Sequence, residues 1–231
     1  MRKNYMSLQG FTLAEVLITL GIIGVVAALT MPSLVANYQK HVTVTRLKKA
    51  YSLIWESVKL AVADHGEISD WEGLEGYTLA GTEAVAAKYF EPYIKGLEYC
   101  NTGFDKKCGG ALTGIFGRNY KMPDGTQISF NMDAYTPDLI GEVLYYSVDI
   151  NGPKPPNKQG NDVFSFTALM DGRVVPGPFI ENATRKELME GIQVYYGTVA
   201  CSSDKTLQYG RYMCTQLIMQ DGWQIKDDYP W

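Results

Sequence analysis

The sequence predicts an α+β fold in which one long N-terminal helix packs on an antiparallel sheet. Three observations support this prediction. An apolar run extends from Phe11 to Val35, an amphipathic segment follows it, and three Asp-Gly pairs lie between apolar stretches farther along the chain. The apolar run predicts the start of the helix, the amphipathic segment its packing face, and the Asp-Gly pairs hairpin turns.

The apolar run is long enough to cross a membrane, which takes about 20 residues as a helix. Arg2 and Lys3 precede it. The positive-inside rule then places the N-terminus in the cytoplasm and the remainder outside. Glu15 is the one charged residue within the run. An intramembrane carboxylate costs roughly 2.5–3.5 kcal/mol and marks a functional position.

The run has two other interpretations. A secretory signal peptide has a shorter apolar region that ends in a small-residue cleavage site, and Ala27 and Ala28 match such a site poorly. A plain membrane anchor leaves Glu15 unexplained. Both interpretations are therefore less favoured than a membrane helix with a second role.

Residues 10–15, which read GFTLAE, make that role specific. They resemble the prepilin cleavage and methylation motif of type IV pilins and type II secretion pseudopilins. The resemblance covers about the first 35 residues and implies cleavage after Gly10, N-methylation of Phe11 and a role in assembly for Glu15. Pro32 falls where many members of that family have a proline that kinks the helix.

The resemblance also implies a pilin-like fold, a cellular location and partners. The expected organisation is a leader peptide at 1–10, a transmembrane and assembly half of the helix at 11–35, an amphipathic half at 36–65 and a head at 66–231. The expected partners are a prepilin peptidase and methyltransferase, other pilin-like subunits and an inner-membrane assembly platform. The expected location is the bacterial inner membrane, crossed once, with the head outside the cytoplasm and later extracted into a periplasmic or surface filament.

Cleavage would also change the charge at the start of the helix. It removes Arg2 and Lys3 and creates an amine at Phe11 that is largely cationic near neutral pH. Glu15 and this amine can then neutralise each other, within one chain or between neighbours. Such a pair is poorly screened in an apolar core and depends on the register of the helices.

The second half of the helix is predicted from its periodicity. Pro32 cannot donate a helical hydrogen bond, so we expect a bend or local melting there. Beyond it, apolar residues recur at helical spacing, and His65-Gly66 is expected to end the helix, with His65 as a neighbour of the C-terminal cap. The apolar positions are Leu47, Tyr51, Ile54, Val58 and Ala61.

The head is predicted from its turns. Residues 67–120 are hard to interpret apart from a short helix within 81–97. Asp124-Gly125, Asp171-Gly172 and Asp221-Gly222 each predict a hairpin. The expected strands are 128–130, 143–148, 163–170, 173–175, 212–219 and 223–225.

Four cysteines lie in two close pairs, and they lack the Cys-x-x-Cys spacing of a zinc site. Two disulfides in an oxidising compartment are the preferred interpretation, and four reduced thiols the other. The sequence does not fix their connectivity. Pairing Cys100 with Cys108 and Cys201 with Cys214 closes the shortest loops.

Residues 149–162 are a candidate calcium site. Asp149, Asn151, Asn161 and Asp162 supply oxygen ligands of the kind calcium prefers. Major pseudopilins carry a calcium site in a head loop, so the resemblance favours this interpretation. The spacing is not that of an EF-hand, and the prolines and glycines suit a plain connector equally well.

Composition narrows the function classes. A net charge of −4 provides no basic field for nucleic acid, and two histidines make a histidine-built site improbable. The sequence has no lipase-type serine motif, zinc-protease motif or phosphate loop. The preferred function is a structural filament subunit without enzymatic activity. The alternatives are a membrane-tethered exported enzyme and an anchored sugar-binding module. Pseudopilin and pilin stay open, with a slight preference for pseudopilin from the 149–166 stretch.

Overall fold

A computed structural model describes residues 10–74, 78–102, 108, 112, 117–132 and 142–231. The chain divides into two compact units, Met1–His41 and Val42–Trp231. Helix α1, Leu13–His65, begins in the first unit and ends in the second. The second unit, called the head here, holds every other element of the described residues.

Helix α1 runs without interruption through Pro32. The expected local melting at this proline is therefore wrong, while the expected bend stays a prediction. The helix ends where its C-terminal signal predicted, because Gly66 adopts a φ of 84° and its N–H donates to the carbonyl of Val62. His65 is the last helical residue.

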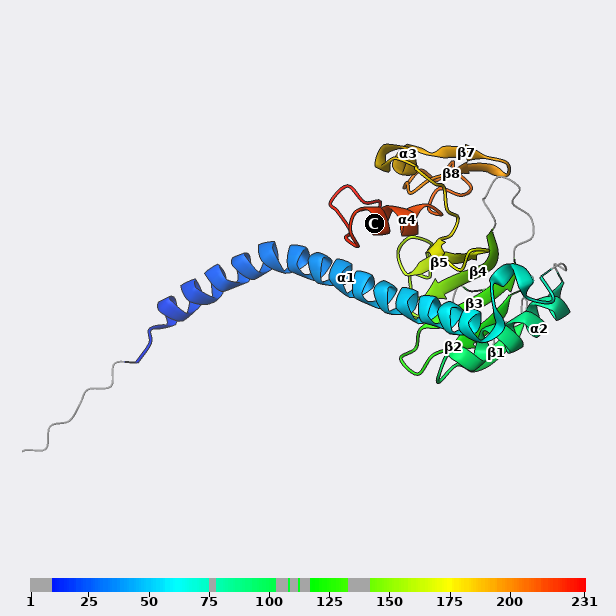
Figure 1. The fold of residues 1–231 in the computed structure, drawn as a ribbon. Helices are drawn as coiled ribbons and strands as arrows, with labels where there is room; N and C mark the ends of the chain where they lie inside the picture. Colours follow the sequence, from blue (N-terminus) through cyan, green and yellow to red (C-terminus); the bar gives the residue numbers. More distant parts are fainter. Residues whose placement is uncertain (1–9, 75–77, 103–107, 109–111, 113–116, 133–141) are drawn as a thin grey trace, which may run out of the picture. The chain divides into compact units, whose positions relative to one another are not determined.

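Six antiparallel strands form the main sheet, in the order of the sequence (Figure 1). Their bounds are β1 Glu98–Thr102, β2 Arg118–Lys121, β3 Gln127–Met132, β4 Glu142–Asp149, β5 Val163–Leu169 and β6 Val174–Pro176. The hairpin turns at Asp124-Gly125 and Asp171-Gly172 connect β2 to β3 and β5 to β6, as predicted. The α+β fold class, with a long helix and an antiparallel sheet, is confirmed.

Large apolar side chains of the central strands form the face of the sheet that meets the helix. Ile128 and Phe130 on β3 are buried together with Tyr146 on β4 and Phe166 on β5. Tyr51 of α1 lies 5.5 Å from Phe166, measured between ring centroids. The apolar stripe of α1 within the head therefore packs on this face of the sheet, as its periodicity predicted.

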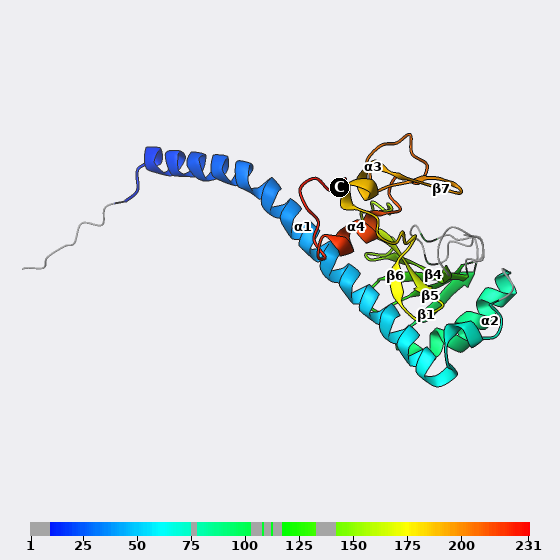
Figure 2. The ribbon, with the colours of Figure 1, turned by 45° about the horizontal axis from the view of Figure 1, so that its top comes forward.

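Short helices complete the head. Helix α2, Leu79–Tyr89, is the one predicted within 81–97, and Figure 2 shows it beside the end of α1. The rings of His65 and Tyr89 meet there, 4.9 Å apart. The other elements are η1 Ile68–Asp70, η2 Glu91–Tyr93, α3 Arg185–Glu190, α4 Cys214–Gln220 and a second sheet of β7 Ile192–Val194 and β8 Gly197–Val199.

The two last predicted strands are wrong. Residues 214–220 form helix α4, and 223–225 are not a strand. The third Asp-Gly pair ends this helix rather than turning a hairpin, because Gly222 donates to the carbonyl of Met219 and Trp223 to that of Ile218. The apolar run was too short to distinguish a buried helix from a strand by periodicity.

Candidate functional site

The candidate cleavage bond lies outside the helix. Gly10 and Phe11 precede the first helical residue, and the Phe11 side chain is 90% exposed. No described atom lies within 4 Å of the position where a Cβ of Gly10 would stand. The fold itself therefore does not require glycine at this position.

Glu15 caps the helix in this chain. Its carboxylate accepts hydrogen bonds from the backbone N–H and the hydroxyl of Thr12, both at 2.8 Å. The N–H of Glu15 donates in return to the Thr12 hydroxyl at 3.2 Å. This reciprocal arrangement is a capping box, which satisfies backbone donors that a helix start leaves unpaired.

Thr12 is the site residue that the sequence analysis missed. Its signal was present, since a threonine followed three residues later by glutamate before an apolar run is the sequence pattern of a capping box. The structure thus gives Glu15 a local partner before any partner from another chain is considered.

Among the described residues of the first unit, the surface from Phe11 to Val35 is largely apolar. Its large hydrophobic side chains are exposed, among them Leu17, Ile23 and Leu29 at 62%, 62% and 76%. By length and composition α1 can cross a membrane. Burying side chains of this size stabilises by roughly 1.5–3 kcal/mol each. A surface of this kind is covered by lipid or by another apolar surface in the functioning protein.

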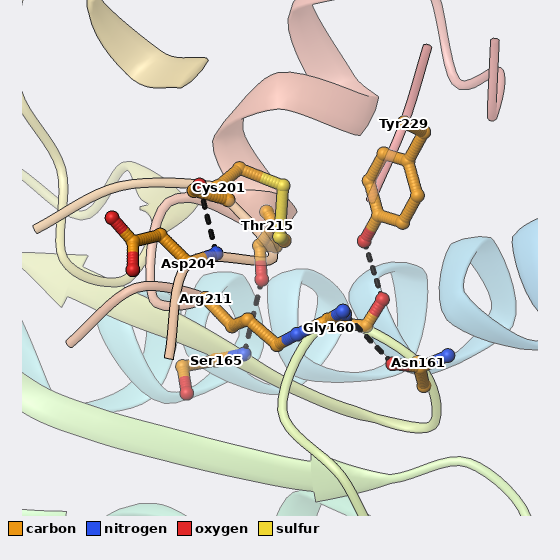
Figure 3. The surroundings of a disulfide bond; sticks show 10 residues. Gly160, Asn161, Ser165, Cys201, Asp204, Arg211, Thr215 and Tyr229 are labelled. Atoms are coloured by element: carbon orange, nitrogen blue, oxygen red, sulfur yellow. Dashed lines mark hydrogen bonds between the residues drawn. A yellow bond between two sulfur atoms is a disulfide. The ribbon is translucent and has the colours of Figure 1, made fainter. Parts of the chain in front are cut away.

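Two disulfides stabilise the head, Cys100–Cys108 and Cys201–Cys214. These are the pairs that close the shortest loops. The second is buried, with each cysteine 1% exposed, and it fixes the start of α4. Figure 3 shows its surroundings, where Gly160 lies against Cys214 and accepts a hydrogen bond from the hydroxyl of Tyr229.

The segment of residues 149–162 contains two of the candidate calcium ligands at each end. Asp149 and Asp162 are 0% and 3% exposed. Both oxygens of Asp162 accept backbone N–H groups, from Asn157 at 2.8 Å and Lys158 at 2.6 Å. The amide of Asn151 donates to Asp162 as well, at 3.2 Å.

The fourth candidate ligand points elsewhere. Asn161 accepts a hydrogen bond from the guanidinium of Arg211 at 2.8 Å (Figure 3). A cationic group beside this oxygen opposes a calcium ion there, and the carboxylate of Asp162 is already satisfied by the loop's own amides. The described residues contain no group of three or more His, Cys, Asp or Glu suited to a metal. These contacts stabilise the loop itself, and the calcium site stays a prediction.

A cluster of charged side chains connects α3 to residues 221–228. Arg185 on α3 donates to Asp221 at 2.8 Å and to Asp228 at 2.6 Å. Lys226 donates to Asp221 at 2.6 Å. Burial raises the pKa of Asp221, but the hydrogen bonds from Arg185 and Lys226 outweigh it, so the net shift is downward. The hydrogen bond from Arg185 likewise lowers the pKa of Asp228.

Comparisons with known proteins give two matches. The profile of DUF6613, a family of unknown function, matches residues 33–231. The chain is also 33% identical, over 118 residues, to the type IV major fimbrial protein FimA of Dichelobacter nodosus, across 48% of this chain and 72% of that protein. No solved structure matches the chain significantly. The family match begins directly after Pro32 and includes the whole head.

Proposed function

We propose that this protein is a membrane-inserted subunit of a type IV pilus-type or secretion-type filament. The chain belongs to the DUF6613 family and is a pilin-like relative of type IV fimbrial proteins. Its role is structural. The first half of α1 holds each subunit in the membrane before assembly. The same apolar surface then packs against neighbouring subunits in the filament.

The exposed apolar surface of the first unit is the observation that supports this function best. Within the described residues of this unit, Glu15 is the only acidic side chain, and it stands at the helix start. A simple anchor uses the carboxylate for the helix cap alone and has no use for its charge. A filament core of parallel helices uses it, because a charge in an apolar bundle favours one register over others.

The finer proposal concerns processing. A prepilin peptidase cuts between Gly10 and Phe11 and methylates the new amine of Phe11, and Glu15 then serves as the partner of that amine. The exposed, non-helical position of the bond supports this proposal, as does a glycine that the fold does not need. A pseudopilus and a type IV pilus both use this processing, and the fimbrial relative is of the second kind.

The head is proposed to lie outside the cytoplasm. Basic residues alone do not favour this orientation, because Lys40, Arg46, Lys48 and Lys49 follow the apolar run and outnumber Arg2 and Lys3 before it. Two disulfides favour export more strongly, since they form and persist in oxidising compartments.

N-terminal sequencing and intact mass of the membrane-extracted protein test the proposal. The expected chain starts at methylated Phe11. Gly10→Val should leave the full-length precursor in the membrane, because a side chain then obstructs the peptidase. Gly21→Ala, within the helix and in open space, is the control and should be processed normally. A mature chain that starts near Thr30 would establish ordinary signal-peptide cleavage instead.

A further inference from the structure

We propose that the two ends of α1 in the head carry opposite charges that pair between neighbouring copies of this chain. This inference rests on the proposed filament function and names the contact between heads. Charge is segregated along the sequence: residues 16–55 contain four cations and no acid, residues 60–87 contain six acids and no Lys or Arg, and Glu56 and Lys59 lie between the two ranges. Lys40 precedes the head, and the other three cations belong to it. The cations are Lys40, Arg46, Lys48 and Lys49, and the acids are Asp64, Glu67, Asp70, Glu72, Glu75 and Glu83.

This arrangement does not serve the stability of the helix. The C-terminal end of a helix carries a partial negative charge and favours cations in its last turn. Asp64 lies in that turn, and Glu67 and Asp70 follow directly after the helix ends at His65. Acids at this end are unfavourable by a few tenths of a kcal/mol each. Asp64 accepts a hydrogen bond from the hydroxyl of Tyr93 at 3.0 Å, so Glu67 and Asp70 are the acids left for another partner.

The relevant side chains are exposed and available. Arg46 at one end, and Glu67 and Asp70 at the other, are exposed and form no ion pair within the residues that the structure describes. Their neighbours differ: Lys49 pairs with Asp124 at 2.6 Å, and Glu72 pairs with Lys88 at 2.7 Å. The unpaired set is therefore separate from the ion pairs that hold the head together.

Helix geometry gives the offset between the two copies. Arg46 lies 18 positions before Asp64 in the last turn of α1, which is five turns or about 27 Å along the axis. Glu67 and Asp70 follow directly after that turn. Subunits inserted in one membrane in one orientation have parallel helices. A copy shifted by about 27 Å along the axis brings its negative end level with Arg46 of its neighbour.

Anionic lipid headgroups are the other partner that suits the basic end, because it follows the apolar run. Lipid leaves the acidic end without a counterpart. A second copy of the chain accounts for both ends with a single contact, so the second copy is the proposed partner.

Charge exchange in the full-length chain tests the pairing. Arg46→Glu and Asp70→Lys should each lower the yield of sheared filaments roughly tenfold, because like charges then face each other. The double variant Arg46→Glu/Asp70→Lys should restore the yield to within about twofold of wild type, since the pair is reformed with its signs exchanged. Lys205→Glu, an exposed charge in a turn of the head, is the control and should assemble normally. The amount of each protein in the membrane fraction is measured alongside.

The outcomes separate this pairing from the proposed function. Wild-type filaments together with unaffected single variants overturn the pairing alone. Reduced single variants without rescue in the double variant also overturn it, and a loss confined to Arg46→Glu with less protein in the membrane indicates lipid as the partner of the basic end. Absence of wild-type filaments overturns the proposed function, and the pairing with it.

Discussion

Glu15 combines two roles at the start of the helix, and two substitutions separate them. Its carboxylate caps the helix through Thr12, and in the proposed filament its charge compensates the amine of Phe11. Glutamine can replace glutamate in a capping box, because its side-chain oxygen accepts the same backbone N–H. Glu15→Gln therefore keeps the cap and removes the charge.

We expect Glu15→Gln to insert into the membrane normally and to lose filament yield by roughly tenfold or more, because the amine is left uncompensated in an apolar core. Thr12→Val is the matched control. It removes the cap, at a cost of roughly 0.5–2 kcal/mol to the helix start, and keeps the charge. Wild-type yield of sheared filaments from Glu15→Gln would contradict the charge role.

The loop between β4 and β5 gives a second prediction at this scale. Because the oxygens of Asp162 already accept N–H groups from Asn157 and Lys158, we expect the melting temperature to be the same in calcium and in chelator. Asp162→Ala should destabilise the chain by about 2–3 kcal/mol in either condition, because hydrogen bonds to a charged group are lost and the amides are left unpaired. A calcium-dependent rise in melting temperature would show that the loop rearranges to bind the ion.

Single residues were predictable where their chemistry depends on near neighbours in sequence. The pairing of Cys201 with Cys214 followed from the shortest loop, and the helix end at His65 from the glycine after it. Asn161 was not predictable, because its partner Arg211 is 50 positions away. A set of oxygen ligands chosen from a loop sequence ignores contacts of this kind, and the calcium site stays a prediction.

Among the elements, α4 is the one where the sequence pattern predicted a strand and the structure has a helix. Residues 214–218 are buried at every position, so neither the alternation of a strand nor the polar stripe of a surface helix is present. The disulfide, the turn after Asp221 and the packing of Leu217 in the core decide the outcome. The central strands were predictable because Asp-Gly turns lie between apolar stretches, although β5 is buried at every position.

The contact of α3 with α4 gives a prediction for stability. Arg185→Met keeps the aliphatic stem and removes the guanidinium that contacts Asp221 and Asp228. We expect a loss of about 1–2 kcal/mol in the free energy of unfolding at pH 7, because the side chain of Asp221 is only 4% exposed and retains Lys226 alone. Lys186→Met on the same helix is the control, since its pair with Glu190 is exposed and should contribute less than about 0.5 kcal/mol.

The effect of pH follows from the direction of the shifts. The pKa values of Asp221 and Asp228 are lower in the folded chain than the ordinary value of 3.8. Their contribution is therefore complete above the ordinary pKa and is lost as the pH falls through the folded pKa. Urea unfolding of wild type and Arg185→Met should show a difference that is constant near neutrality and shrinks below about pH 4. A difference independent of pH would mean that Arg185 acts through packing alone.

At the scale of the whole molecule, the division at His41 separates two surfaces with opposite requirements. The first unit exposes apolar side chains that need lipid or other helices. The head buries an apolar core of its own, built from α1 beyond Val42, the sheet and the short helices. From the change from an uninterrupted apolar run to an amphipathic pattern, the sequence predicted a boundary within the helix after residue 35 and a head from residue 66. The compact units instead divide after His41, and the roles assigned to the predicted segments stay predictions.

The division predicts that residues 42–231 fold without the first unit. The truncated chain keeps the buried stripe of α1 from Val44 to Ala61 and both disulfides. We expect it to be soluble without detergent and monomeric by size-exclusion chromatography, with both disulfides found by non-reducing mass mapping. Because it lacks the apolar helix and Glu15, it should also be absent from filaments when it is expressed together with the full-length chain.

The control for this truncation starts at residue 55, within α1, and removes half of the buried stripe. Loss of Leu47, Ala50 and Ile54 from the core should prevent folding, since truncating one large buried side chain alone costs about 2–5 kcal/mol. Insolubility of the 42–231 chain, or recovery of free thiols from it, would mean that the first unit is part of the fold. Entry of the 42–231 chain into filaments would show that the heads alone direct assembly, which contradicts a core built from the apolar helices.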